Sequence, residues 1–524
     1  MKTMKSLKHL TLMILVGPLL LAATLQTQLA EAQLSELYAF QYNANTTSNY
    51  PDGQTPLAEL IQGADGNYYT TTFQGGSGAC PSDFQGVIAG CGTVVKITPA
   101  GQLTVVYSFP YDSSNSTAPN GMYSEAGLLQ GPDGNFYGTT VAGGTEGTNF
   151  CVNGQIFGCG TIFKLTPGGA LTVLHDFCGG YGCTGLATDG VLPLGRLALG
   201  PDGNLYGTTE QGGFYDGLYN QGTIFRISLS GAYSIVHLFT GGVGTGDGED
   251  PGAGLTLGSD GNFYGTTEAG GTSQLGTVFK MNLAGAVKIL HSFSGSDGQV
   301  PWGALVQASD GNFYGTCYGG GANAAGSVFR ISESGSFLKL YDFDGIVGAY
   351  PRAGLIQASD GNLYGATGHG GSGGLGAIYQ ITLAGVATQE ASFTGNTGWA
   401  PVDALVQGSD GQIYLTQQND GGSNGQGVQD SGAIDVFNAG LAPPKPGIFG
   451  FAPSSGKVGA KVTLGFGPYI GATSVKFNGT SATFKVTGSE FVTATVPAGT
   501  TTGTISVTTP GGTATSTKMF TVVP

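Results

Sequence analysis

The sequence predicts an all-β protein: a seven-bladed β-propeller with four-stranded blades, followed by a small immunoglobulin-like β-sandwich. The main observation is a sequence motif that occurs seven times. It consists of an apolar run, then Asp-Gly-Asn (or Asp-Gly-Gln), then an apolar residue and Tyr. Successive copies lie 50 to 69 residues apart, which suits a unit of four short strands, and seven such units favour a propeller. The aspartates of the seven copies are Asp65, Asp133, Asp202, Asp260, Asp310, Asp360 and Asp410.

The fourth copy shows why each repeat is expected to form four antiparallel strands. Residues 254–258 form a short apolar strand, and the Asp-Gly-Asn turn at 259–262 tolerates positive φ. Aromatic and β-branched residues then favour strands at 263–267, 276–281 and 287–293. Each aspartate is therefore interpreted as a turn residue. A calcium loop would need several converging oxygen ligands.

The repeat is circularly offset, which favours a closed ring. The seventh copy runs from Phe437 directly into Pro443-Pro444 and lacks a fourth strand. The segment Leu34–Phe40, ahead of the first full copy, matches the fourth strand of the first repeat at Val105–Phe109. We therefore predict that the N-terminal strand completes the last blade, which removes an exposed sheet edge.

The loops predict which face of the propeller is elaborated. Turns between the first and second strands, and between the third and fourth, are short and nearly constant. Length varies in the loops after the second and fourth strands, which open on the other face because neighbouring strands are antiparallel. Since loops carry function more often than the elements they connect, any ligand is expected on this elaborated face.

Residues 1–32 resemble a secretory signal peptide. Three lysines precede an apolar run, and Ala30-Glu31-Ala32 is typical of a cleavage site, with an uncleaved membrane anchor as the alternative. We expect export to the cell surface or the extracellular space, no transmembrane segment after cleavage, and a monomer. The net charge of −15 argues against binding to nucleic acid.

Seven cysteines in an exported chain suggest disulfides. Proximity in the sequence predicts three pairs: Cys80 with Cys91, Cys151 with Cys159, and Cys178 with Cys183. The alternative is that some of them are free. Cys317 occupies a position that is Thr in other repeats, and it is expected to be a free cysteine whose side chain is buried in the core.

The composition changes after the propeller. Propeller residues 33–441 are followed by a Pro-rich linker at 442–446. Residues 447–524 are rich in Thr, Val, Ser and Ala, and alternate as short strands between Gly and Pro turns. This pattern predicts the immunoglobulin-like sandwich, without an inter-sheet disulfide.

Several phrases resemble known families. Leu-Ile-Gln-x-x-Asp-Gly-Asn-x-Tyr-Gly-x-Thr, Gly-Thr-x-Phe-Lys and Leu-His-x-Phe resemble the bacterial GloVer tandem repeat of "choice-of-anchor" surface proteins. The segments Phe451–Gly456, Gly471–Gly479 and Val507–Gly512 are similar to an IPT/TIG domain. The resemblance implies export, surface display and no established activity.

Aromatic residues on the elaborated face are the candidate ligand-binding residues. Trp302, Tyr350 and Trp399 lie beside loop prolines in successive repeats, and His369 lies in the loop after a second strand. Flat rings of this kind stack on sugars or on apolar side chains. The alternative is that they seal the seams between blades.

The acidic loop at Asp247, Glu249 and Asp250 is the candidate metal site, for Ca²⁺, with a solvated acidic loop as the alternative. No other cofactor is expected.

The function remains open. The favoured one is a non-enzymatic secreted or surface protein with a binding or structural role, whose ligand is a glycan, an envelope component or a protein bound on the elaborated face. A purely structural role in a surface layer is a further possibility. The alternative is an extracellular polysaccharide-active enzyme, a glycosidase or lyase, for which Glu210, Glu268, Asp216 and Asp247 are candidate carboxylates.

Overall fold

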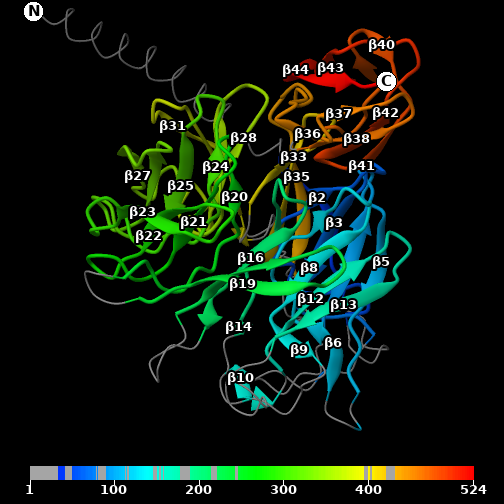
Figure 1. Cartoon of the computed structure of the whole chain (residues 1–524). Coiled ribbons are helices and arrows are strands. Elements are labelled where there is room, and N and C mark those ends of the chain that lie inside the picture. The colour runs from blue at the N-terminus through cyan, green and yellow to red at the C-terminus, as the bar shows by residue number, and fades with distance from the viewer. Residues whose placement is uncertain are drawn as a thin grey trace, which may run out of the picture.

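The computed structural model describes residues 34–524, except 42–49, 78–79, 81–89, 113, 115–116, 145–149, 153–154, 157, 178–188, 214–220, 242–245, 395–398, 402–403, 420–430 and 466. The described residues form strands, turns and irregular segments, so the all-β prediction is confirmed. They make two units, a ring unit (residues 34–437) and a C-terminal unit (residues 450–522) (Figure 1).

The described part of the ring unit contains six four-stranded antiparallel sheets and a seventh sheet with a fifth, additional strand, a propeller-like arrangement. In each sheet the first strand is very short and lines the centre, and the fourth lies outermost. From inner to outer strand, the sheets are β2 (Ile61–Gln62), β3 (Tyr68–Thr72), β4 (Thr93–Ile97), β5 (Leu103–Ser108); β7 (Leu129–Gln130), β8 (Phe136–Thr140), β12 (Thr161–Leu165), β13 (Leu171–Asp176); β15 (Ala198–Leu199), β16 (Leu205–Thr209), β18 (Thr223–Ile227), β19 (Tyr233–Leu238); β20 (Thr256–Leu257), β21 (Phe263–Thr267), β22 (Thr277–Met281), β23 (Val287–Ser292); β24 (Val306–Gln307), β25 (Phe313–Cys317), β26 (Ser327–Ile331), β27 (Phe337–Asp342); β28 (Ile356–Gln357), β29 (Leu363–Thr367), β30 (Ala377–Ile381), β31 (Ala387–Ser392); and β33 (Val406–Gln407), β34 (Ile413–Asn419), β35 (Ala433–Phe437), β1 (Leu34–Ala39). We number them sheets one to seven in this order.

The N-terminal strand closes the ring as predicted. β1 pairs antiparallel with β35, from Leu34 opposite Phe437 to Ala39 opposite Ala433. Phe40 is 2% exposed and extends the pairing with a hydrogen bond from its N–H to the Gly432 carbonyl oxygen. The two ends of the repeat array are therefore joined by main-chain hydrogen bonds.

The Asp-Gly-Asn turns work as structural turns. In the fourth sheet, Asp260 Oδ1 accepts the N–H of Asn262 at 3.0 Å, and Asp260 Oδ2 accepts the hydroxyl of Tyr264 at 2.9 Å. Tyr264 is fully buried, so the turn aspartate satisfies a hydroxyl that would otherwise lie unpaired in the core. The same tyrosine-to-aspartate bond, of 2.7 to 3.1 Å, occurs in all seven sheets.

A second network links neighbouring sheets at the ends of the inner strands. In five places a glutamine side-chain oxygen accepts a main-chain N–H from the turn of the preceding sheet, at 2.8 to 3.0 Å. The donor and acceptor pairs are Ala64 with Gln130, Ser259 with Gln307, Ser309 with Gln357, Ser359 with Gln407, and Ser409 with Gln62. In the two remaining places the donor position is Pro132 or Pro201, and the acceptor position is Leu199 or Leu257. Proline has no N–H to donate, so an apolar residue at the partner position leaves no unpaired amide oxygen.

This complementarity gives a testable pair of variants. Gln307→Leu leaves the Ser259 N–H without its acceptor and should lower the free energy of unfolding by about 1–2 kcal/mol in chemical denaturation. Ser259→Pro combined with Gln307→Leu reproduces the natural pair Pro201 and Leu257, and should recover most of that loss. A double variant less stable than Gln307→Leu would contradict this explanation.

Additional strands enlarge one face of the ring, as expected. They are β6 (Ala118–Met122) paired with β9 (Ala142–Gly144), β10 (Phe150–Val152) paired with β11 (Gln155–Ile156), β14 (Gly190–Val191) paired with β17 (Gln211–Gly212), and β32 (Trp399–Pro401) paired with β34. The first three pairs lie at the end of the ring unit opposite the C-terminal unit (Figure 1). We call their end the loop face and the opposite end the base face.

The cysteines follow the prediction where they are described. Cys80 and Cys91 form a disulfide, and Cys317 is free and fully buried. Cys159 is also disulfide-bonded, but the side chain of its expected partner Cys151 lies outside the described residues. The predicted pair Cys178 and Cys183 lies outside them too.

The C-terminal unit has two sheets around one core. One contains β36 (Gly450–Ala452), β38 (Lys461–Gly465), β42 (Phe491–Thr495) and β41 (Phe484–Gly488); the other contains β37 (Ser455–Gly456), β44 (Gly512–Val522), β43 (Gly503–Thr509), β39 (Ser474–Phe477) and β40 (Thr480–Ser481). Val462, Val492, Val475 and Ile505 come from both sheets and are buried in one apolar cluster.

The C-terminal unit is docked on the base face. Phe491 is 2% exposed and packs in an apolar cluster with Leu129 and Leu199 of the inner strands. The linker carbonyl oxygen of Ala442 accepts hydrogen bonds from Ser359 Oγ at 2.6 Å and Gln407 Nε2 at 3.2 Å. The C-terminal unit is therefore packed against the ring unit.

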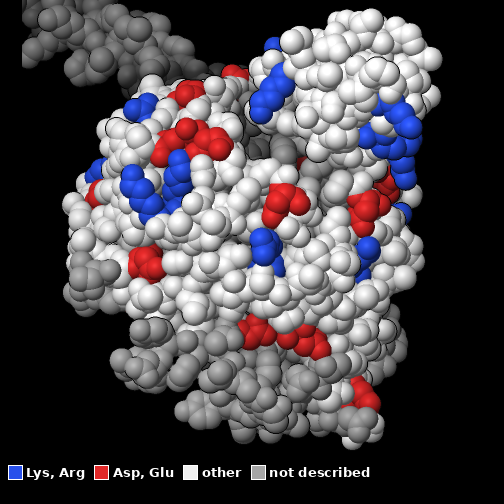
Figure 2. All heavy atoms as spheres, viewed as in Figure 1, with Lys and Arg blue, Asp and Glu red and all other residues white. Residues whose placement is uncertain are grey.

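Charged groups are sparse on the surface. In the view of Figure 2 they form small, scattered groups on a mostly uncharged surface, in keeping with 10% charged residues. No helix that is long and apolar enough to cross a membrane occurs among the described residues.

Candidate functional site at the centre of the loop face

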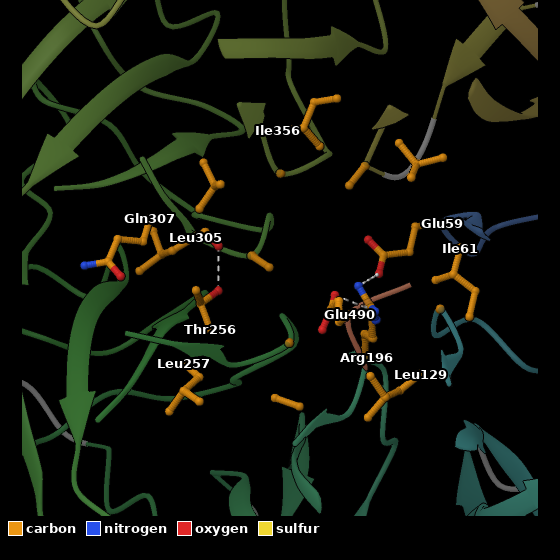
Figure 3. A pocket seen from close by; sticks show the side chains of 18 of the residues that line it. Glu59, Ile61, Leu129, Arg196, Thr256, Leu257, Leu305, Gln307, Ile356 and Glu490 are labelled. Carbon is orange, nitrogen blue, oxygen red and sulfur yellow. Dashed lines mark hydrogen bonds and ion pairs between the residues drawn. The ribbon is translucent and has the colours of Figure 1, made fainter. Parts of the chain in front are cut away.

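The inner strands enclose a cavity of about 1460 Å³ that extends to the base face, where residues of the C-terminal unit line it (Figure 3). Side chains alternate along a strand, so every second residue of each inner segment faces the centre. In the fifth sheet these are Trp302, Ala304 and Val306, and in the sixth they are Arg352, Gly354 and Ile356. The repeat therefore places three layers of side chains from the loop face to the base face.

The middle layer consists mainly of small residues. Its positions are Glu59, Gly127, Arg196, Gly254, Ala304, Gly354 and Ala404. Position 354 requires glycine because the inner segments of the fifth and sixth sheets approach each other closely there. A Cβ atom at Gly354 would lie 2.7 Å from the Ala304 carbonyl oxygen of the fifth sheet. The small residues keep the centre of the ring open.

Two charged residues in the middle layer pair with each other. Arg196 of the third sheet lies 3.0 Å from Glu59 of the first and 3.5 Å from Glu490 of the C-terminal unit. Gly127 makes room for this bridge, since a Cβ there would lie 2.3 Å from Glu59 Cγ. The ionic residues thus occupy one side of the cavity, and Thr256 and Ile356 line another (Figure 3).

The opening of the cavity on the loop face carries three carboxyl groups. Glu125, Glu210 and Glu268 come from loops of the second, third and fourth sheets, and all three line the cavity. Gly252 leaves room for Glu268, because a Cβ there would lie 2.4 Å from Glu268 Oε1. The Trp302 side chain interacts with Glu268 and partly offsets the rise in the pKa of that carboxyl group.

Burial and mutual repulsion change the acidity of these groups. Desolvation raises the pKa of Glu268 to about 7, and the Glu210 and Asp250 carboxylates contribute. Burial, assisted by the Glu210 carboxylate, raises the pKa of Glu125 to about 7. Near neutral pH these groups are therefore able both to donate and to accept hydrogen bonds.

The raised pKa values predict a pH dependence of stability. Between the ordinary glutamate pKa of 4.5 and about 7, the folded protein binds more protons at Glu125 and Glu268 than the unfolded chain. Their contribution to the free energy of unfolding is therefore complete below pH 4.5 and is lost as the pH rises through 7, by about 3 kcal/mol for each group.

We expect the double variant Glu125→Gln, Glu268→Gln to gain thermal stability relative to the parent at pH 8 but not at pH 5. The comparison isolates these two groups from others that titrate, and Glu390→Gln on an outer strand is the matched control. An equal difference between variant and parent at both pH values would contradict the assignment.

Aromatic side chains extend away from this opening. Ring centroids of Trp302 and Tyr318 are 4.6 Å apart, those of Tyr318 and Tyr350 are 5.4 Å apart, and those of Tyr350 and His369 are 5.7 Å apart. The guanidinium of Arg352 lies 5.3 Å from the Trp302 ring centroid and 5.7 Å from that of Tyr318. We call Trp302, Tyr318, Tyr350 and His369 the aromatic row.

Strained loop residues hold the row in place. Val300 and Tyr350 precede loop prolines with φ of 53° and 56°, a conformation that is costly for residues other than glycine. The Val300 carbonyl oxygen accepts the N–H of Tyr318, and the N–H of Val300 donates to Leu275 of the preceding sheet. These bonds fix the backbone at Tyr318 and at Val300, two residues before Trp302.

The structure brings together three of the four residues predicted to bind a ligand. Trp302, Tyr350 and His369 belong to the aromatic row, across the seam between the fifth and sixth sheets. For Trp399 only the backbone is described, and it pairs with Asn419 in β32.

The predicted metal ligands are arranged differently. Asp247 Oδ2 lies 2.7 Å from His237 Nε2, and its other oxygen accepts the Thr240 N–H, so this carboxylate secures the outer strand. Within the described ranges, no three His, Cys, Asp or Glu side chains are grouped as metal ligands. Asp247, Glu249 and Asp250 therefore do not form the expected site there. Asp216 lies outside the described residues.

Sequence reasoning missed Glu125, Tyr318 and Arg352. Tyr318 follows the second strand at the position of Glu210 and Glu268, and Arg352 occupies the position of Trp302 and Glu125. Aligning the repeats position by position would have found all of them, because equivalent positions face the same central opening.

The fold and this opening define a propeller-like, all-β repeat protein with a central cavity. The model of the Gloeobacter/Verrucomicrobia repeat matches residues 25–214 and 193–429. The chain therefore belongs to this family, as its repeated phrases indicated. None of the curated proteins matches the sequence.

Solved structures with a similar arrangement are distant. Virginiamycin B lyase from Staphylococcus aureus is 12% identical, with a TM-score of 0.46 over 77% of this chain and 98% of that one. A fungal alcohol oxidase of the AA5 family is 13% identical, with a TM-score of 0.42 over 90% and 98%. A putative 6-phosphogluconolactonase from Bacteroides fragilis is 16% identical, with a TM-score of 0.40 over 68% and 92%. At these scores the likeness carries no argument about function.

Proposed function

We propose that this is an exported, non-enzymatic protein that binds a glycan at the centre of the loop face. In this proposal residues 1–32 are removed, the ring unit is a seven-bladed β-propeller, and the C-terminal unit is an immunoglobulin-like IPT/TIG domain. The seven sheets and the pairing of β1 with β35 support the propeller, and the two-sheet core of the C-terminal unit supports the immunoglobulin-like domain.

The observation that carries the proposal is the junction of the aromatic row with the three glutamates. Flat rings offer apolar faces on which the C–H faces of a sugar stack. Carboxyl groups and the Arg352 guanidinium supply the donors and acceptors that sugar hydroxyls need. Trp302 connects the two sets, because it lines the cavity, contacts Tyr318 and interacts with Glu268.

A glycan array probed with the mature chain, followed by calorimetry on the strongest binder, tests the proposal. We expect Trp302→Ala combined with Tyr318→Ala to weaken binding about tenfold or more, since each desolvated ring contributes roughly 0.5–2 kcal/mol. Tyr111→Ala, in a loop outside the row, is the matched control and should leave the affinity unchanged. Absence of binding to every glycan, or equal affinity of the double variant, would contradict the proposal.

The raised pKa of Glu268 supports a second candidate, a glycoside-cleaving enzyme. A general acid must hold its proton near the working pH, and a pKa of about 7 allows this. Glu210 would then be the second carboxylate of the pair. Release of new reducing ends from bound polysaccharide, abolished by Glu268→Gln, would favour this candidate over binding alone.

A further inference from the structure

One wall of the central cavity is apolar and smooth from the loop face downward. In the fourth to seventh sheets the middle layer is Gly254, Ala304, Gly354 and Ala404, and the layer below is Thr256, Val306, Ile356 and Val406. The Thr256 hydroxyl donates to the Leu305 carbonyl oxygen at 2.5 Å, so its polar group is already satisfied within the protein. None of these eight residues carries a charge.

The lower layer differs between the two sides of the ring. Ile61 and Leu129, from the first two sheets, are buried, and Leu129 is packed in one cluster with Phe491 of the C-terminal unit. All six residues line the cavity, but Thr256, Val306, Ile356 and Val406 remain only partly buried. Apolar surface facing a cavity is a favourable place for an apolar group of a ligand.

The ionic residues do not block this wall. Glu59, Arg196 and Glu490 are paired with one another from the first sheet, the third sheet and the C-terminal unit. They lie on the side of the cavity away from Thr256 and Leu257 (Figure 3). An apolar chain along the fourth to seventh sheets would therefore not need to desolvate a charge.

We infer that the ligand is an amphiphilic glycan, whose sugar contacts the glutamates and the aromatic row and whose apolar group, an alkyl or acyl chain, enters the central cavity. This inference rests on the proposed function and adds the chemical class of the ligand. The small middle layer provides the passage, and the partly buried aliphatic residues below it provide the apolar contact. The C-terminal unit, which lines the far end, limits the length of chain that fits.

Alkyl glycosides provide the test. The affinity of the mature chain for methyl, hexyl and octyl β-glycosides of glucose, galactose and N-acetylglucosamine would be measured by calorimetry below micelle-forming concentrations. Complete burial of a methylene corresponds to about a fourfold gain in affinity. We expect at least a tenfold gain from methyl to hexyl and a further gain to octyl.

Two variants locate the effect. Ala304→Phe fills the middle layer and should abolish the gain with chain length, while binding of the methyl glycoside changes less than twofold. Val386→Phe places the same ring at an exposed position, where Val386 is 64% exposed, and should leave the gain intact.

The outcomes separate the two claims. If methyl and octyl glycosides bind equally well, the inference is wrong and the proposed glycan site stands. If the gain persists in Ala304→Phe, the chain lies outside the cavity and the inference is also wrong. If no glycoside of any length binds, the proposed function fails and the inference fails with it.

Discussion

A chain that begins at Gln41, and so lacks Leu34–Phe40, is expected to lose the cooperative unfolding of the ring unit. The deletion removes all of β1 and exposes the main-chain edge of β35. Leu34 and Phe40 are 6% and 2% exposed, and burying one such side chain contributes about 1.5–3 kcal/mol. With the lost main-chain hydrogen bonds, the total reaches about 5 kcal/mol or more, comparable to the whole stability of many domains.

Thermal unfolding followed by near-ultraviolet circular dichroism measures this effect. A synthetic peptide of residues 33–41, added in excess, should restore the transition, because it supplies the missing outer strand. The same peptide with Leu34 and Phe40 replaced by Ser is the control and should not. A truncated chain that melts within a degree or two of the mature protein would show that β1 does not close the ring.

Gly315→Thr should strongly destabilise the ring unit. Gly315 lies opposite Phe329 in the paired strands β25 and β26. A Cβ atom at Gly315 would lie 2.6 Å from Phe329 Cζ and 2.7 Å from Leu305 Cδ2. Such overpacking costs about 3 kcal/mol, because the close-packed core cannot yield.

The first sheet indicates how to compensate this change, since its equivalent pair is Thr70 opposite Val95. Gly315→Thr combined with Phe329→Val should therefore recover more than half of the lost stability in chemical denaturation. Gly450→Thr is the matched control, because a Cβ at this strand glycine meets no atom within 4 Å. A double variant less stable than Gly315→Thr alone would contradict the size-matching explanation.

The sequence predicted what depends on local spacing. Strand positions, the Asp-Gly-Asn turns and the N-terminal closing strand follow from hydrophobic alternation and from the count of strands per repeat. The turn aspartates were interpreted correctly because one carboxylate in a tight turn lacks the converging oxygens of a metal site. Their bond to the buried tyrosine, as in Asp260 and Tyr264, explains why the motif ends in Tyr.

What the sequence did not predict depends on contacts between repeats. A glycine on the second strand of a sheet lies opposite an aromatic residue on the third strand, as Gly315 lies opposite Phe329. This pairing depends on the register of the two strands, which the sequence of a single repeat does not reveal. Pro201 and Leu257 replace a hydrogen-bonded pair whose two members lie in neighbouring sheets. This replacement is visible only when successive repeats are compared. The ion pair between Arg196 and Glu490 connects the ring unit with the C-terminal unit, two regions that are far apart in the sequence.

The candidate site was predicted in part for the same reason. Trp302, Tyr350 and His369 were chosen as aromatic residues on the elaborated face, and they lie in one row. Tyr318 and Glu125 are not predictable from the sequence of a single repeat, because the ring brings equivalent positions of different repeats around one opening.

The fluorescence of Trp302 tests the central claim, that ligand binds at this opening, most directly. The sequence has two tryptophans, so the variant Trp399→Phe reports on Trp302 alone. Titration of this variant with the glycan that binds most strongly on the array should give a saturable change in tryptophan emission. Its midpoint should match the dissociation constant from calorimetry. Calorimetric binding of that glycan with no change in Trp302 emission would place the ligand elsewhere and contradict the claim.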